Sequence, residues 1–142
     1  MIGAKFLSSS KPLGVTALVV FFSFGCTMSG LAAMMLIYPG SVLDALWRLN
    51  PRAHDSLHAM GVWAVALMLS ACFACAGAAT GLKRRRLWGF WIAVAILGIN
   101  FVGDLVNAVF AHDWRTLIGL PIGIIMLAYL LANRRIFHSP QA

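Results

Sequence analysis

The sequence contains no glutamate, and its only acidic residues are aspartates, 4 in number against 11 lysines and arginines. Charged residues make up 11% of the 142 positions, whereas a soluble domain carries about 25%. Such a chain cannot cover a surface of its own in water, which excludes a soluble globular fold. The three cysteines, Cys26, Cys72 and Cys75, lie within apolar runs and are odd in number, so they indicate no disulfide framework.

Apolar residues take the place of the missing charge. Hydrophobic residues account for 61% of the chain, and its mean hydropathy is +0.88. The net charge of +7 does not indicate a nucleic-acid partner, because the basic residues flank apolar runs rather than gather on one solvated face. This arrangement is typical of topology signals and lipid-headgroup contacts. The class is therefore integral membrane.

Four apolar runs predict the architecture. A helix that crosses a bilayer needs about 20 mostly apolar residues. The runs that meet this requirement cover about residues 13–38, 59–82, 87–110 and 116–132. No soluble domain or long linker separates them, so we expect a single all-α transmembrane domain over residues 1–142, an integral membrane four-helix bundle.

The distribution of lysine and arginine predicts the orientation. Eight of them accompany the two termini and the loop between the second and third runs, and three lie on the opposite side. The positive-inside rule then places both termini in the cytoplasm. The basic residues expected to contact lipid headgroups on that side are Lys83, Arg84, Arg85, Arg86, Arg134 and Arg135.

The connection between the first two runs, SVLDALWRLNPRAHDSLHAMG, is too long for a simple turn. Ser41 with Asp44 resembles a capping box and predicts a short helix with an apolar face, lying in the outer interface. Asn50 as cap and Pro51 as first residue predict a second helix. We expect that second helix to continue into the second span.

Histidines in this connection raise the question of a metal site. His54 and His58 are one helical turn apart, and His112 with Asp113 lies in the other outer loop. Zinc needs three or four ligands, and an i, i+4 pair without a fixed third ligand is a weak signal. We therefore expect these imidazoles to meet water or headgroups, and we predict no metal and no other cofactor.

A polar stripe interrupts the third run in the segment NFVGDLVNAVF. Asn100, Asp104 and Asn107 are spaced i, i+4 and i+7, so they share one face of a helix. Lipid offers such side chains no hydrogen-bond partners, and the stripe should therefore face the bundle or a wet cavity.

Two interpretations of Asp104 compete. It binds a proton or cation whose path Asn100 and Asn107 line, or it pairs with an arginine and holds the outer loops onto the bundle. Because no second ionisable group lies deeper in any run, the ion pair is the favoured interpretation. The candidate partners on the outer side are Arg48, Arg52 and Arg115.

Cys72 and Cys75 form a C-x-x-C motif, which some membrane oxidoreductases use. Helical rise places the motif about 20 Å in from the outer end of its run, where apolar surroundings blunt thiol reactivity. We expect a packing role for these residues, and we predict that the chain is not an enzyme.

Four segments spread along the chain carry a family likeness: PLGVTAL, LDALWRLNP, GDLVNAV and DWRTLIGLPIG. Through them the chain resembles a family of small bacterial four-helix membrane proteins. The resemblance implies a bacterial inner-membrane protein with a four-helix bundle, and it assigns no catalytic residue.

The sequence favours a non-enzymatic accessory or scaffold protein of the membrane. It would bind lipid, another membrane protein or a second copy of itself through the outer helix and through faces of small residues. The alternative is a small transporter or permeability protein built around Asn100, Asp104 and Asn107.

Overall fold

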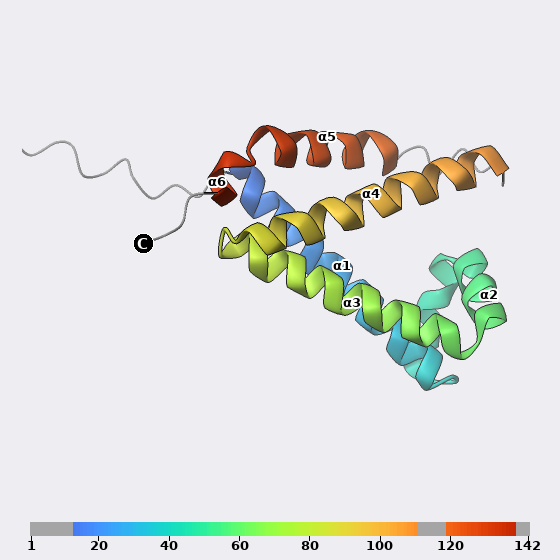
Figure 1. Cartoon of the computed structure of the whole chain (residues 1–142). Coiled ribbons are helices and arrows are strands. Elements are labelled where there is room, and N and C mark those ends of the chain that lie inside the picture. The colour runs from blue at the N-terminus through green and yellow to red at the C-terminus, as the bar shows by residue number, and fades with distance from the viewer. Residues whose placement is uncertain (1–12, 111–118, 139–142) are drawn as a thin grey trace, which may run out of the picture. The chain divides into compact units, whose positions relative to one another are not determined.

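The computed structural model describes residues 13–110 and 119–138, and every element in these ranges is helical (Figure 1). The predicted all-α class is therefore confirmed for the described residues. The elements are α1 (Leu13–Ile37), the 3-10 helix η1 (Val42–Leu49), α2 (Pro51–Met60), α3 (Val62–Lys83), α4 (Leu87–Phe110), α5 (Gly119–Ala132) and α6 (Arg135–His138).

Three of these helices, α1, α3 and α4, are long and apolar enough to cross a membrane. α4 has the predicted bounds, and α1 and α3 differ from the predicted runs only at their ends. α5 is apolar but shorter, with 14 residues. Residues 116–118, which the sequence assigns to the same run as α5, lie outside the described ranges.

The chain forms two compact units. The first comprises the residues up to Phe21 and those from Gly77 onward, and the second comprises residues 22–76. The first unit therefore contains the start of α1, the end of α3 and all of α4, α5 and α6. The second contains the rest of α1, η1, α2 and most of α3.

A tight turn at residues 84–86 joins α3 to α4 in the first unit. Its hydrogen bonds form a Schellman motif: the Arg86 N–H donates to the Gly81 carbonyl over 2.9 Å, and the Arg85 N–H donates to the Leu82 carbonyl over 3.0 Å. Arg85 takes the left-handed position of the motif, with φ of 51°. This conformation suits glycine and costs other residues about 1–2 kcal/mol.

Two glycines bring α3 and α4 into direct backbone contact beside this turn. A methyl group on Gly81 or Gly89 would overlap the backbone of the other, and on Gly89 it would also come within 2.8 Å of the Leu82 nitrogen. Small residues allow such close helix approach. Leu82 and Phe90, the neighbours of the two glycines, are buried.

The other helices of the first unit return to the same end. α5 packs along α4, and α6 contacts the start of α4, where the rings of Phe137 and Phe90 lie 5.5 Å apart. Tyr129 of α5 lies directly on Gly14 near the start of α1. The start of α1, the α3–α4 turn and α6 therefore meet at one end of this unit (Figure 1).

In the second unit the predicted capping box at the start of η1 does not form, because the Ser41 side chain makes no cap hydrogen bond and the Asp44 carboxylate does not reach the Ser41 N–H. The Asp44 carboxylate accepts a hydrogen bond from the N–H of Gly40, one residue before the cap. The Ser41 hydroxyl oxygen is buried and has no hydrogen-bond partner among the described residues. Gly40 has φ of 85°, which permits the sharp exit from α1.

The predicted start of α2 is confirmed, whereas its predicted continuation into the second span is wrong. Asn50 accepts a hydrogen bond from the Ala53 N–H over 3.2 Å, and Pro51 is the first helical residue. α2 ends before Gly61, whose φ of 57° breaks the helix. α3 begins only at Val62, so the amphipathic α2 and the apolar α3 are separate helices.

The contact between Gly81 and Gly89 can be tested by adding one methyl group. We expect Gly89→Ala to destabilise the protein by about 1–3 kcal/mol, the usual cost of overpacking, because the methyl would enter the backbone of α3. Gly98→Ala is the matched control on the same helix, since nothing lies within 4 Å of its added methyl. Thermal unfolding of the full chain in one detergent measures both. Equal melting temperatures for the two variants would contradict the close approach.

Candidate functional site

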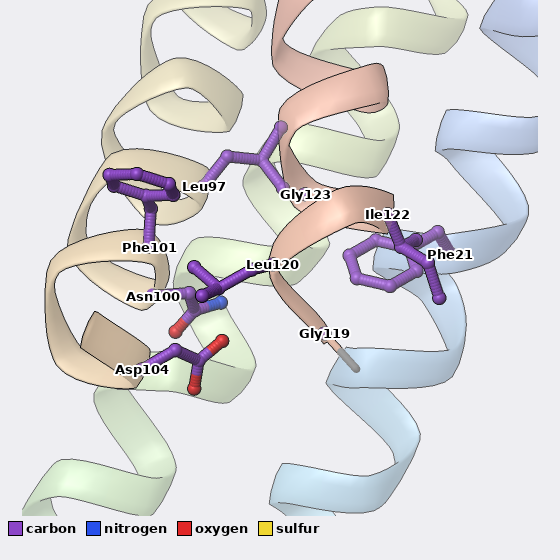
Figure 2. A pocket seen from close by; sticks show the side chains of 9 residues that line it. All are labelled: Phe21, Leu97, Asn100, Phe101, Asp104, Gly119, Leu120, Ile122 and Gly123. Carbon is purple, nitrogen blue, oxygen red and sulfur yellow. The ribbon is translucent and has the colours of Figure 1, made fainter. Parts of the chain in front are cut away.

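Asn100 and Asp104 project from the same side of α4 (Figure 2). They are one helical turn apart, as the predicted stripe requires, and Figure 2 shows both beside Leu120 of α5. The third member of the stripe, Asn107, belongs to α4, but its side chain is outside the described part of the structure. The stripe therefore faces another helix over the two residues that can be followed.

A cavity of about 320 Å³ opens at this position within the first unit. Most of its wall is apolar. Its lining residues are Phe21 of α1, Leu97, Asn100, Phe101 and Asp104 of α4, and Gly119, Leu120, Ile122 and Gly123 of α5. Asn100 and Asp104 thus line a cavity, one of the two environments that the sequence predicts for the stripe.

Glycines of α5 make the room for this cavity. A methyl group on Gly119 would lie 3.2 Å from Oδ2 of Asp104, and on Gly123 it would meet nothing within 4 Å. The carboxylate therefore approaches the backbone of α5 directly. Small residues four positions apart are typical of close helix packing, and no local pattern distinguishes that role from the lining of a cavity.

Asp104 supplies the charge of the site. Among the described residues that line the cavity, it is the one ionisable side chain. Its carboxylate is half-buried, and Asn100 contributes an amide that both donates and accepts hydrogen bonds. Such a lining suits a positively charged or hydrogen-bonding group.

The predicted ion pair of Asp104 stays a prediction. Arg48 and Arg52 belong to the second unit, and Asp104 belongs to the first. Arg115 lies outside the described residues.

The histidines of α2 form a cluster of tilted rings with Trp47 of η1. The ring of His54 lies 5.2 Å from that of Trp47 and 4.9 Å from that of His58. Nδ1 of His54 is 3.3 Å from Oδ1 of Asp55. Within the described ranges, no group of three or more metal-binding side chains comes together; His112 and Asp113 fall outside those ranges.

The basic residues gather at one end of the first unit. Lys83 ends α3, and the turn that follows carries three arginines. Arg134 directly precedes α6 and Arg135 is its first residue. This helix contacts the beginning of α4 through Phe137 and Phe90. Two basic segments that are about 50 residues apart in the sequence, 83–86 and 134–135, therefore share one end of this unit.

The thiol that Cys72 contacts belongs to Cys26 and not to Cys75, its partner in the C-x-x-C motif. Sγ of Cys72 on α3 lies 3.4 Å from Sγ of Cys26 on α1. Gly25 and Gly30 of α1 stand close to Cys75 and Cys72, since added methyls would lie 3.4 and 3.5 Å from those sulfur atoms. Small residues and thiols thus form the contact between α1 and α3 in the second unit, a pairing that sequence spacing does not reveal.

This thiol contact predicts a specific cross-link. Oxidation of the full chain with copper phenanthroline should join Cys26 to Cys72, because their sulfur atoms are already in contact. Mass spectrometry after alkylation should find the third thiol, that of Cys75, as the alkylated one. Cys75→Ser should still cross-link, and Cys26→Ser should not. A cross-link between Cys72 and Cys75 would show that α1 and α3 do not meet here.

Comparison with models of protein families, with characterised proteins and with solved structures finds no match. No role passes from a relative to Asn100, Asp104 or the cysteines.

Proposed function

We propose that the chain is a multi-pass protein of a bacterial inner membrane, in which α5 joins the three longer apolar helices in a four-helix bundle. The exposure of these helices supports this. Each helix contains an apolar stretch of 18 residues, and only a small share of that stretch is buried within the chain: 17% in α1, 17% in α3 and 22% in α4. In water this much exposed apolar surface would be unfavourable, whereas lipid covers it at no such cost.

The proposed orientation has both termini in the cytoplasm. The basic end of the first unit supports it, because basic residues favour the cytoplasmic side and contact anionic headgroups there. Trp88 and Trp91, near the start of α4, are exposed at the same end. Tryptophan favours the boundary between lipid and water, so these side chains fit an interfacial level beside the arginines.

The function that the site supports best is the binding and passage of a small solute across this membrane, without catalysis. One observation carries this proposal: Asp104 and Asn100 line a cavity of about 320 Å³ between apolar helices. Ionisable groups at membrane depth mark substrate and ion pathways. Pockets for small molecules combine apolar walls with a few polar groups in the same way.

The second candidate is the accessory or scaffold protein that the sequence favours. The exposure of η1 supports it, because Val42 is 94% exposed and Leu49 is 84% exposed. Apolar side chains on a short helix outside the spans suit contact with lipid or with another membrane protein. In this function Asp104 would pair with an outer arginine and stabilise the fold.

Replacing one carboxylate separates the two functions. In proteoliposomes loaded with monovalent ions, amines or neutral solutes, the transport function predicts that Asp104→Asn lowers flux tenfold or more, a loss of about 1.4 kcal/mol in transition-state stabilisation, at unchanged melting temperature. Asp55→Asn is the control, since the Asp55 side chain is 82% exposed on α2, and should leave flux unchanged.

The scaffold function predicts the opposite pattern for the same variant. Asp104→Asn would lower the melting temperature, and a second change of Arg48, Arg52 or Arg115 to Gln would recover part of the loss. Wild-type proteoliposomes would show no flux above that of empty liposomes. That result would contradict the transport proposal.

A further inference from the structure

We infer that the cavity at Asp104 takes a small organic monocation, an amine or quaternary ammonium with an apolar body. This inference rests on the proposed function of the same site and names its ligand class. Three properties of the cavity support it: its charge, its walls and its size.

The charge of the described lining favours a single positive charge on the ligand. Asp104 brings one carboxylate, and none of the described lining residues is basic. An anion would face this carboxylate without a counter-charge, and a neutral solute would leave the carboxylate unpaired in a largely apolar cavity. A monocation neutralises this carboxylate, and a protonated amine can also donate a hydrogen bond to the Asn100 amide oxygen.

The donor set does not suit a bare metal ion. Ca²⁺ takes six to eight oxygen ligands, and Mg²⁺ needs octahedral oxygen coordination. The described side chains of the cavity offer the two oxygens of Asp104 and one of Asn100. The other lining side chains are aliphatic, aromatic or glycine, so a metal ion would lose its hydration shell without replacement.

Those walls instead suit the apolar body of an organic cation. Phe21 and Phe101 contribute aromatic rings, and Leu97, Leu120 and Ile122 contribute aliphatic surface. Aromatic faces attract ammonium groups within about 6 Å of the ring centre. A ligand with a cationic head and a hydrocarbon part therefore matches both parts of the lining (Figure 2).

The volume limits the ligand to a small one. About 320 Å³ is at the lower end of the range of roughly 300–1,000 Å³ for ligand pockets. Gly119 and Gly123 set this volume, because side chains there would extend into it.

Benzyltrimethylammonium is a suitable probe, since it combines one fixed charge with one aromatic ring. Calorimetry on the full chain in lipid nanodiscs should show saturable binding, with empty nanodiscs as the blank. Benzyl alcohol, the uncharged compound with the same ring, should show no saturable binding. Asp104→Asn should weaken binding of the cation tenfold or more, and Asp55→Asn should leave it unchanged.

A second variant tests the cavity without touching the carboxylate. Gly123→Leu places a side chain where nothing lies within 4 Å of the new Cβ, and it should abolish binding by filling the space while α5 stays folded. Circular dichroism confirms the fold of each variant. Equal binding by Gly123→Leu and the wild type, equal binding by Asp104→Asn and the wild type, or equal binding of benzyl alcohol would overturn the inference.

The flux assay keeps this inference separate from the proposed function. Saturable, Asp104-dependent binding of the cation without flux would support the inference and contradict transport. Asp104-dependent flux of another solute, without binding of benzyltrimethylammonium, would overturn the inference and leave transport standing.

Discussion

Backbone contact between Gly81 and Gly89 fixes how closely α3 and α4 pack in the first unit. Because the chain turns within three residues, α4 starts directly beside the end of α3, and any side chain at either glycine would force the two helices apart. The same turn presents consecutive basic residues at this end. Asp104 lies about 26 Å along the helix from Leu87, the first residue of α4, at 1.5 Å per residue. Helix length alone therefore separates the basic turn from the acidic cavity.

Features set by local chemistry could be predicted from the sequence. Asn50 accepts the cap hydrogen bond expected of it, and α4 spans the predicted apolar run. The break at Gly61 could not, because the residues around that glycine are compatible with one continuous helix. The backbone conformation of Arg85 could not be predicted either. A basic loop predicts exposure, but the left-handed backbone of this residue depends on the Schellman hydrogen bonds at the end of α3.

The candidate site divides in the same way. Periodicity places Asn100 and Asp104 on one face, and their shared cavity agrees with it. The cavity wall that faces these two residues is formed by α5, and its position depends on how α5 packs on α4. Gly119 and Gly123 could therefore be recognised as small residues but not as residues that line a cavity. Cys26 and Cys72 are 46 residues apart, and only the packing of α1 on α3 brings them together.

Arg85 holds a backbone conformation that disfavours any side chain, and it does so within a run of four basic residues. The backbone cost of about 1–2 kcal/mol is similar to the attraction of about 1 kcal/mol between one basic residue and an anionic membrane surface. Glycine would relax the turn but remove the charge. In the membrane proposed for this protein, the two effects nearly cancel. The stability of this helix end then depends on the fraction of anionic lipid in the leaflet that it faces.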